Sequence, residues 1–167
     1  MKLLILSDIF GNWPALEAVI QAEPDFDAVA FCGDAVGFGP CPVECIHWLR
    51  EHANFAVRGN HDNAVAFQRE CHCQDSLREL SQPTRTWHEI LISDADREFL
   101  RGLPILDWFE WQGKHFRMAH ATPRGDLFEF LPMAGWENRV KDLDGTWMVI
   151  SYFWGTLASR ECALSES

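Results

Sequence analysis

Basic side chains are scarce in this chain. Its 167 residues hold 14 Lys and Arg against 25 Asp and Glu, which gives a formal net charge of −11 at pH 7. A chain this acidic repels a nucleic-acid backbone and an anionic membrane surface, so we expect neither a nucleic-acid polymer nor a membrane among its partners. Divalent cations suit this charge better than polyanions do.

Long apolar runs and targeting signals are also lacking. No run approaches the ~20 residues that a membrane-spanning helix needs. The opening stretch MKLLILSD reaches an acidic side chain after too few apolar residues for a signal peptide. We therefore expect a soluble, cytoplasmic protein whose six cysteines stay reduced. At this length one domain can bury a sufficient core without disulfides.

Three short apolar runs in the first third of the chain indicate strands, at residues 2–8, 27–34 and 54–60. Helical patterns separate them, WPALEAVIQA and PVECIHWLREH. Strands that alternate with helices predict a parallel sheet with right-handed crossovers, and such sheets carry their sites at the carboxyl ends of the strands. The polar residues at the ends of these runs are Asp8, Asp34, Asn60 and His61.

The rest of the chain predicts helices and then a second sheet. Residues 62–103 are helical in pattern, with a capping box formed by Ser93 and Asp96. Two strand patterns around a Gly-Lys turn begin a second sheet near residue 105, and His120 ends the second of them. TWMVISYFW predicts a last strand, and the tail that follows it has no core pattern.

The polar residues at the predicted strand ends are donors for a divalent metal. They are the oxygen and nitrogen ligands that Mn²⁺, Fe or Zn²⁺ accept: Asp8, Asp34, Asn60, His61 and His120. Two metals ~4 Å apart, bridged by a carboxylate, make hydroxide available at neutral pH and suit the hydrolysis of phosphate esters. A neighbouring histidine can protonate the leaving oxygen. Taken singly, each residue is more often a turn or cap residue, but their convergence at one sheet edge favours a site.

Four blocks of the sequence carry a family resemblance. In this order, SDIFGNWPALEAVI, FCGDAVGFGPCPVECI, VRGNHDNAV and AHATPRGDLFEFL resemble the calcineurin-like metallophosphoesterases, particularly their small bacterial and archaeal phosphatase and phosphodiesterase branch. The resemblance covers about residues 1–150. It implies an α/β fold, a four-layer α/β/β/α sandwich with two central sheets. It also implies the hydrolysis of small phosphate mono- or diesters at a dinuclear centre of Mn²⁺, or of Fe, Zn²⁺ or Ni²⁺.

The resemblance assigns roles to single residues. Asp8 would bind the first metal and Asp34 would bridge both. Asn60 and His120 would bind the second metal. By the same comparison His61 would contact the phosphate and assist the leaving group, with Asp62 orienting it.

Two arginines next to these residues are candidates for binding the substrate. Arg58 lies in VRGNHD and Arg124 in TPRGD, each beside a proposed ligand. A guanidinium group binds phosphate oxygens well, so either could hold the phosphate of a substrate.

The family pattern is broken in two places. The first block of the family reads D-x-H, and Phe10 stands in the place of its histidine, where phenylalanine has no lone pair for a metal. Where the family ends in G-H-x-H, this chain has SYFW, which places Tyr152 and Trp154 at the two histidine positions. We therefore expect a truncated carboxyl end, with an incomplete metallophosphoesterase domain at residues 1–150 and a divergent tail at 151–167.

The leading hypothesis is a metallophosphoesterase with an incomplete dinuclear centre. The alternative, which Phe10 favours, is a catalytically inactive relative that acts as a metal- or phospholigand-binding regulatory module. A Rossmann-type nucleotide-binding protein would explain the start of the chain but not GNHD, and the first turn lacks G-x-G-x-x-G.

Other potential ligands lie outside these blocks. In ECHCQD, at residues 70–75, Cys71, His72 and Cys73 lack the two-residue gap of a zinc knuckle, so a solvent-facing helix is the favoured interpretation. Surface or packing roles are expected for His47, His52, His88 and His115.

Overall fold

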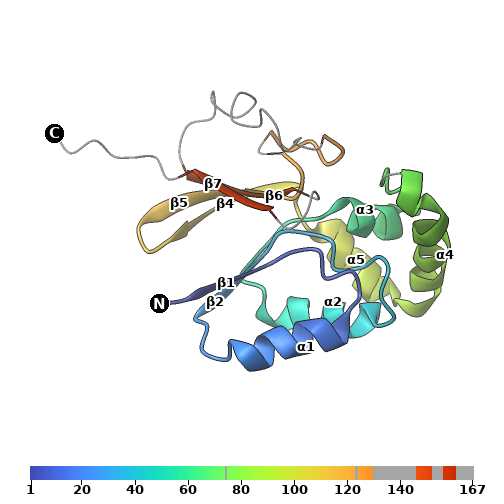
Figure 1. The fold of residues 1–167 in the computed structure, drawn as a ribbon, viewed down its shortest axis with the longest axis horizontal. Helices are drawn as coiled ribbons and strands as arrows, with labels where there is room; N and C mark the ends of the chain where they lie inside the picture. The colour runs from blue at the N-terminus through green and yellow to red at the C-terminus, as the bar shows by residue number, and fades with distance from the viewer. Residues whose placement is uncertain (74, 123, 130–145, 152–155, 161–167) are drawn as a thin grey trace.

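The computed structural model describes residues 1–129, apart from residues 74 and 123, together with the backbone of 146–151 and 156–160. These residues form two sheets, with helices beside the first (Figure 1). The predicted α/β class with two central sheets is therefore confirmed. The outer layer that the sandwich would have beyond the second sheet is not among the described residues.

The first sheet is parallel and has the order β1-β2-β3, from Leu3–Leu6, Ala28–Phe31 and Phe55–Ala56. Helices α1 (Trp13–Ala22) and α2 (Pro42–His52) connect its strands and have the bounds that the sequence patterns predict. Each strand is shorter than its apolar run, so Asp8 and Asp34 lie in the loops that follow β1 and β2 at the carboxyl edge of the sheet.

Local signals account for the start of both helices. The side chain of Asn12 accepts a hydrogen bond from the backbone N–H of Ala15 at the start of α1, and α2 begins with Pro42, whose fixed backbone angle suits a first helical turn. The buried face of α2 packs Ile46 and Leu49 against the first sheet. Each such buried side chain stabilises the fold by about 1.5–3 kcal/mol.

The third predicted strand, 54–60, is wrong at its end. Strand β3 stops at Ala56, and Asn60 is the first residue of α3 (Asn60–Phe67). Gly59 is the residue just before α3. The helix begins after it because the carboxylate of Asp62 accepts a hydrogen bond from the N–H of Gly59 at 3.1 Å. Asn60 and His61 therefore belong to a helix start and not to a strand end.

Residues 62–103 are largely helical, as predicted. They contain most of α3, then α4 (Asp75–Leu91) and α5 (Asp94–Gly102). The capping box is confirmed, with the N–H of Asp96 donating to Ser93 Oγ at 3.2 Å and the N–H of Ser93 donating to the Asp96 carboxylate at 3.0 Å. The stretch that holds Cys71 and Cys73 is a loop with both cysteines buried, so the solvent-facing helix favoured there is wrong.

The second sheet has the order β4-β5-β6-β7. Its strands are Leu106–Trp111, Lys114–Ala119, Thr146–Ser151 and Thr156–Arg160. The hairpin of β4 and β5 is antiparallel, as predicted, while β6 joins β5 in parallel. Strand β7, antiparallel to β6, lies in the tail for which the sequence indicated no core pattern. Tyr152 and Trp154 lie outside the described residues, and the boundary between 150 and 151 stays a prediction.

A second apolar core lies between the sheets. Met118 from β5 is fully buried with Ala30 of β2 and with Val57, which follows β3. The rings of Phe55 and Phe109 stack at a centroid distance of 4.0 Å. In Figure 1 the second sheet lies on one side of β1 and β2, with α1 and α2 on the other.

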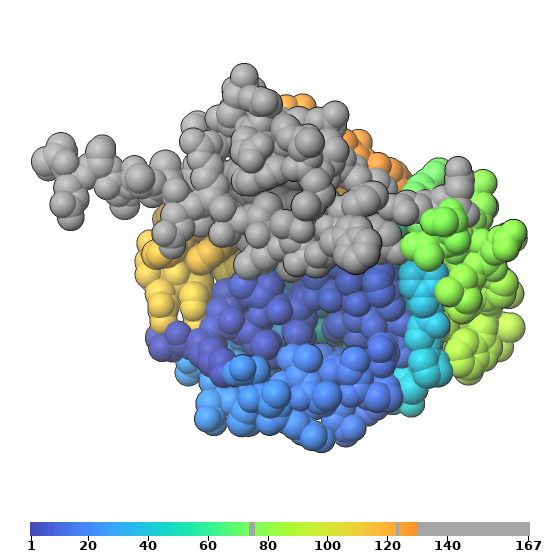
Figure 2. All heavy atoms as spheres, in the orientation of Figure 1, coloured from blue at the N-terminus to red at the C-terminus, as the bar shows by residue number. Residues whose placement is uncertain are grey.

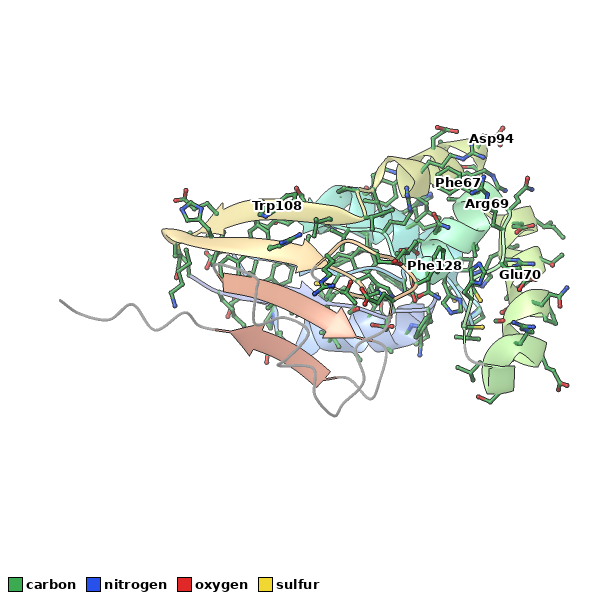
Figure 3. All side chains as sticks on the ribbon, turned by 90° about the horizontal axis from the view of Figure 1, so that it is seen from above. Phe67, Arg69, Glu70, Asp94, Trp108 and Phe128 are labelled. Carbon is green, nitrogen blue, oxygen red and sulfur yellow. The ribbon has the colours of Figure 1, made fainter. Side chains whose placement is uncertain are left out.

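The carboxyl edge of the first sheet faces the helical end of the molecule. Figure 2 shows the β4–β5 hairpin (yellow) and α4 (green) at opposite ends of one face, with the first βαβ segment (blue) between them. In Figure 3 Trp108 of the hairpin likewise lies far from Glu70, which precedes α4. Within the described part of the chain, no helix has both the length and the apolar character to cross a membrane.

Candidate metal centre

Three segments meet at the carboxyl edge of the first sheet. The loop after β1 carries Asp8, the loop after β2 carries Asp34, and the start of α3 carries Asn60. The first two loops are joined by their backbones, since the N–H of Asp8 donates to the carbonyl of Gly33 and the N–H of Phe10 to that of Asp34, each at 2.9 Å. Asp8, Phe10 and Asp34 have φ values of 54°, 54° and 62°. Non-glycine residues adopt this left-handed conformation at a cost, and it is concentrated at functional sites.

Glycines let these segments approach closely. A Cβ atom on Gly33, whose φ is +98°, would lie 2.7 Å from Nδ1 of His120, and one on Gly59 would lie 2.0 Å from Oδ1 of Asp34. No side chain fits at either position without moving the ligands.

Asp8, Asp34 and His120 form a compact cluster of ligand atoms. One oxygen of each carboxylate and one ring nitrogen of His120 all lie within 4.8 Å of one another. Asp8 Oδ1 and Asp34 Oδ2 are buried and have no hydrogen-bond partner among the residues that the structure describes. Asp34 Oδ2 does lie 3.4 Å from Nε2 of His120, as an ion pair. Two buried carboxylates this close to each other favour a bound cation.

The pKa values of these groups reflect their crowding. Burial, followed by the charge of Asp34, raises the pKa of Asp8 to about 6. Burial alone would raise the pKa of Asp34, but His120 and His61 together hold it below its usual value. For His120, burial opposes the charged form, yet the carboxylates of Asp34 and Asp8 raise its pKa to about 9.

The ring of His120 is oriented for metal binding. Its Nδ1 lies 2.8 Å from the carbonyl oxygen of Cys32, which can only accept, so this nitrogen carries a proton. Nε2 faces the cluster, 3.0 Å from Oδ1 of Asn60. The amide of Asn60 is held in turn by its Nδ2, which donates to the carbonyl of Cys71 at 2.8 Å. A metal ion would replace the proton on Nε2 of His120 and meet the arrangement of partners typical of histidine ligands.

The donor set fits a divalent ion of the Mn²⁺ kind. Two carboxylates, a histidine and a neighbouring amide oxygen offer the hard and borderline donors that such ions prefer. Asp8, Asp34 and His120 would hold the ion, with the amide oxygen of Asn60 beside them.

Aromatic rings occupy the place where the family has its first-block histidine. The ring centroid of Phe10 lies 5.2 Å from that of Phe38 and 5.3 Å from that of His61. Phe38 in turn lies 4.9 Å from His61. A Cβ atom on Gly37 would lie 2.7 Å from the ring of Phe10, so this aromatic ring is tightly packed against the backbone of Gly37. Burial lowers the pKa of His61, which is therefore a neutral imidazole at pH 7.

Two buried polar side chains shape the loop after β2. The carboxylate of Asp62 accepts hydrogen bonds from the backbone N–H groups of Asp34, Gly59 and Val36 at 2.8, 3.1 and 3.2 Å. These hydrogen bonds position the loop of Asp34. That Asp62 also orients His61 stays a prediction. Nδ1 of the fully buried His88 accepts a hydrogen bond from the N–H of Gly37 at 3.2 Å.

The sequence held no signal for this use of His88, because 51 residues separate it from its partner Gly37. Its Nε2 lies 2.8 Å from the carbonyl oxygen of Gly39, so the ring spans the turn that carries Phe38. Sequence reasoning also missed Phe38, since an aromatic residue in a glycine-rich turn has no pattern that marks it as a neighbour of His61.

The two arginine candidates lie in different surroundings. The guanidinium group of Arg58 donates to the carbonyls of Arg101 and Leu103 at 2.8 and 3.1 Å and lies over the ring of Phe67. Figure 3 shows Phe67 beside Arg69 at the end of α3. Both of these hydrogen bonds come from one terminal nitrogen of Arg58 and tie it to the end of α5, while its Nε has no hydrogen-bond partner among the described residues. That Arg58 holds a substrate phosphate stays a prediction. Arg124 is exposed on the segment after His120, and its role stays a prediction.

Sequence comparison adds the following relatives. The sequence profile of the calcineurin-like phosphoesterases matches residues 1–157. The uncharacterized protein MJ0912 of Methanocaldococcus jannaschii is 28% identical over 130 residues, which cover 76% of this chain and 52% of that protein. The phosphodiesterase YfcE of Escherichia coli strain K12 is 29% identical over 153 residues, which cover 79% of this chain and 78% of YfcE.

Solved structures resemble the fold. A metallophosphoesterase from Sphaerobacter thermophilus is 30% identical, with a TM-score of 0.64, and the match covers 78% of this chain and 51% of that one. The hypothetical protein PH1004 from Pyrococcus horikoshii OT3 has a TM-score of 0.66 at 22% identity, over 89% of this chain and 68% of its own, and supports the fold alone. The present chain spans about half the length of MJ0912 and of the Sphaerobacter protein, 52% and 51% respectively.

Proposed function

Since this chain belongs to the calcineurin-like phosphoesterase family, we propose that it hydrolyses small phosphate mono- or diesters with a divalent metal ion, Mn²⁺ first among them. The observation that carries the proposal is the cluster of Asp8, Asp34 and His120, whose ligand atoms lie within 4.8 Å of one another. Its two buried carboxylates, with Asp8 Oδ1 lacking a hydrogen-bond partner among the described residues, favour a bound cation. YfcE, a relative of 29% identity, is a phosphodiesterase.

Two side chains, Asn60 and Asp62, would hold the metal ligands in place. A bound divalent ion would lower the pKa of a water molecule and neutralise charge on the phosphoryl group. Asn60 keeps the ring of His120 directed at the cluster through the contact between Oδ1 and Nε2 at 3.0 Å. Asp62 holds the backbone of Asp34 through its N–H at 2.8 Å.

We further propose that His61 serves the leaving group. Its backbone N–H donates to Oδ1 of Asp34 at 2.8 Å, which fixes the start of α3 next to the metal ligands. Burial keeps the ring neutral, but an anionic phosphate next to it would favour the protonated form, from which it could pass a proton to the leaving oxygen.

A dinuclear centre in this chain would be uneven. In the family arrangement Asp34 bridges, with Asn60 and His120 on one side and Asp8 on the other. Phe10 leaves the Asp8 side with only two carboxylates. We propose that the ion on this side binds weakly and that hydrolysis is slower than a complete set of ligands would allow.

A metal titration tests the proposal. The whole chain, stripped with a chelator, is assayed with Mn²⁺ on p-nitrophenyl phosphate and bis-p-nitrophenyl phosphate. We expect hydrolysis that depends on Mn²⁺ and falls at least about 100-fold in Asp34→Asn, since even outer partners of a ligand contribute 10–100-fold. Asp25→Asn, which removes an exposed aspartate, is the matched control and should behave as the unmodified chain. Hydrolysis that survives in Asp34→Asn would overturn the metal mechanism.

The second candidate function is a regulatory module that binds a metal or a phosphorylated ligand without turnover. The packing of Phe10 and Phe38 against His61 favours this regulatory module, because Phe10 occupies the position at which the family has a histidine ligand. Mn²⁺ binding measured by calorimetry, without turnover of either ester, would support the module. Turnover that appears in Phe10→His alone would show that the rest of the site is competent.

A further inference from the structure

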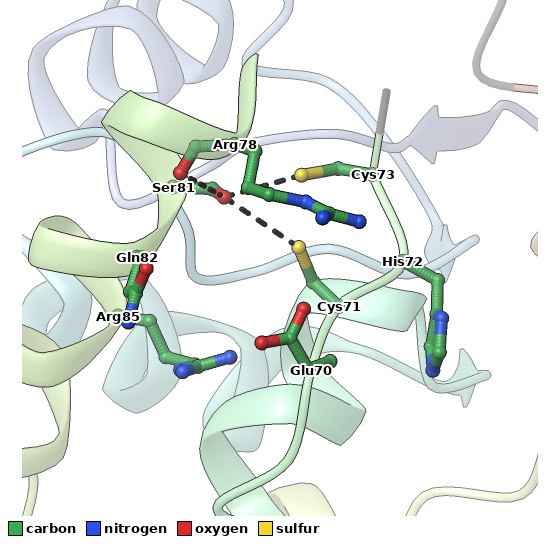
Figure 4. Close-up of a pocket in the computed structure, with 8 residues that line it drawn as sticks. All are labelled: Glu70, Cys71, His72, Cys73, Arg78, Ser81, Gln82 and Arg85. Carbon is green, nitrogen blue, oxygen red and sulfur yellow. Dashed lines mark hydrogen bonds between the residues drawn. The ribbon is translucent and has the colours of Figure 1, made fainter. Parts of the chain in front are cut away.

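The loop between α3 and α4 carries two buried cysteines on one side. Cys71 and Cys73 expose only 6% and 8% of their surface, while His72 between them is exposed. His72 has a φ of 52°, and its ring packs edge-on against Phe128 at a centroid distance of 4.7 Å. In Figure 4 both sulfur atoms point toward α4 and the His72 ring points away from them.

One hydroxyl group brings the two sulfurs together. The thiols of Cys73 and Cys71 donate to Oγ of Ser81 at 3.1 and 3.7 Å, as the dashed lines in Figure 4 show. Ser81 is itself buried, and its hydroxyl donates to the carbonyl of Arg78 at 3.2 Å. The two thiols therefore converge on one point from the same face of the loop.

The third member of this group comes from α3. A ring nitrogen of His61 and the sulfurs of Cys71 and Cys73 all lie within 4.8 Å of one another, and all three residues are buried. The absence of a two-residue gap in ECHCQD argued against a zinc site in the sequence. The fold removes that objection, because the third ligand comes from GNHD, ten residues before Cys71.

We propose that His61, Cys71 and Cys73 bind a thiophilic divalent cation, Zn²⁺, at a site separate from the cluster of Asp8, Asp34 and His120. Zn²⁺ binds sulfur at about 2.3 Å and nitrogen at about 2.0–2.1 Å, which places tetrahedral ligand atoms about 3.6–3.8 Å apart. The three ligand atoms lie within 4.8 Å of one another, so each pair must approach by at most about 1.2 Å to reach these spacings. The fourth position falls to a water molecule or to the hydroxyl of Ser81.

Ligand chemistry separates the two clusters. Oxygen donors on Asp8 and Asp34 favour Mn²⁺, whereas thiolates select Zn²⁺ over Mn²⁺. Two thiolates also balance the charge of one Zn²⁺. Arg78 and Arg85 line the same pocket. The clusters touch through Asn60, whose Nδ2 donates to the carbonyl of Cys71 at 2.8 Å while its Oδ1 faces His120.

The shared histidine gives the zinc site a consequence for catalysis, a step that rests on the proposed function. A His61 ring bound to Zn²⁺ has no lone pair left to carry a proton to the leaving group. Zn²⁺ at this site should therefore inhibit the hydrolysis that Mn²⁺ supports.

Cobalt spectroscopy tests the site without reference to activity. The whole chain, reduced and stripped of metal, is titrated with Co²⁺, which replaces Zn²⁺ in thiolate sites and is seen through sulfur-to-metal charge-transfer absorbance in the near ultraviolet. We expect this absorbance to saturate at one equivalent and to vanish when Zn²⁺ is added. Cys71→Ser and Cys73→Ser should each weaken Co²⁺ binding at least about tenfold and reduce the absorbance.

Matched variants test whether the Co²⁺ absorbance comes from the loop of Cys71 and Cys73. Cys41→Ser, which alters a partly exposed cysteine, and Asp34→Asn, which alters the other cluster, should leave the absorbance unchanged. His61→Ala should weaken binding while the sulfur absorbance remains. An absorbance that both loop serine variants retain, or no absorbance in the unmodified chain, would overturn the proposal.

A second measurement covers the case in which the cysteine variants fail to fold. X-ray absorption of the unmodified chain with one equivalent of Zn²⁺ should show two sulfur neighbours at about 2.3 Å. A shell of oxygen and nitrogen alone would overturn the site. Because neither readout involves hydrolysis, an inactive chain that binds Zn²⁺ through sulfur would contradict the proposed function and leave the zinc site standing.

Discussion

The oxygen-rich cluster of Asp8, Asp34 and His120 and the sulfur-rich cluster of His61, Cys71 and Cys73 are held in different ways. In the first, backbone hydrogen bonds join the loops, and Gly33 and Gly59 allow contacts that no other residue would allow. In the second, side chains hold the loop of the two cysteines: the hydroxyl of Ser81 accepts from the Cys73 thiol, and the amide of Asn60 donates to the carbonyl of Cys71.

This difference bears on how each cluster can change. Ligands fixed by the backbone keep their positions when a metal leaves, which suits a site that must be ready for substrate. Ligands on a short loop can close around an ion by a small movement, which suits a site that fills and empties. We expect the first cluster to be rigid and the second to respond to the metal that is present.

The largest effect is expected where the first cluster is most tightly packed. In Gly59→Ala the new Cβ would lie 2.0 Å from Oδ1 of Asp34, so either the ligand or the start of α3 must move. We expect a loss of about 3 kcal/mol in the free energy of unfolding, at the upper end for overpacking, with Mn²⁺ binding lost as well. Urea denaturation and calorimetry measure the two.

Gly102→Ala is the control for this change. Nothing lies within 4 Å of a Cβ atom there, and the residue is exposed near the end of α5. Its stability should equal or exceed that of the unmodified chain, since alanine favours a helix over glycine by up to about 1 kcal/mol. Equal losses in both variants would show that the close contact at Gly59 is not what matters.

The next effect concerns the metal itself. The carboxylates of Asp8 and Asp34 crowd each other when no ion lies between them, and burial with the charge of Asp34 raises the pKa of Asp8 to about 6. Mn²⁺ at 100 times its dissociation constant should raise the free energy of unfolding by about 2.7 kcal/mol, and a chelator should reverse the gain. Thermal unfolding with and without Mn²⁺ measures it. The same gain in Asp34→Asn would place the ion elsewhere.

A smaller gain is expected from restoring the missing ligand. Phe10→His places an imidazole beside the cluster, and histidine tolerates the φ of 54° at this position better than phenylalanine. We expect Mn²⁺ to bind at least about tenfold more tightly, which corresponds to about 1.4 kcal/mol. Calorimetry provides the measurement. Phe38→His replaces the other ring that packs against His61 and is the control. Its affinity for Mn²⁺ should stay unchanged; an equal gain in affinity would mean that an imidazole at either position strengthens Mn²⁺ binding.

The smallest effect should lie outside both clusters, at the start of α5. Hydrogen bonds from Ser93, together with Arg50 and His47, outweigh burial and lower the pKa of Asp96 below its usual value. Asp96→Asn should therefore cost about 1 kcal/mol of unfolding free energy at pH 7. A lowered pKa means that the contribution is present above the unfolded value of 3.8 and is lost as the pH falls through the folded value. Urea denaturation at pH 7, 4 and 3 should show the difference shrinking; a constant difference would assign it to packing.

Local sequence signals predicted the helices well. Both α1 and α2 have the bounds that their apolar spacing indicated. The capping box of Ser93 and Asp96 was also correct. These signals act over one or two turns of chain, so the sequence alone contains them. The end of β3 was mistaken because an apolar run does not show where a glycine will begin a helix.

The sequence could predict that the candidate ligands lie close together, but not which other residues surround them. Asp8, Asp34 and His120 follow apolar runs, and the structure brings them together with Asn60. Adjacency in VRGNHD did not indicate that one nitrogen of Arg58 would be tied to the end of α5. The buried positions of Cys71 and Cys73 were missed for a related reason, since a short loop has no periodicity to reveal its inner face.

The sequence by itself determined the order of strands and helices around the first sheet, because proline, caps and apolar spacing act between near neighbours. The four sequence blocks pointed to the family. Only the tertiary structure decided which donors meet. His120 reaches Asn60 across 60 residues and His88 reaches Gly37 across 51. Such contacts depend on how the two sheets and α4 pack together, so His61 lies between two clusters for a reason that no local pattern contains.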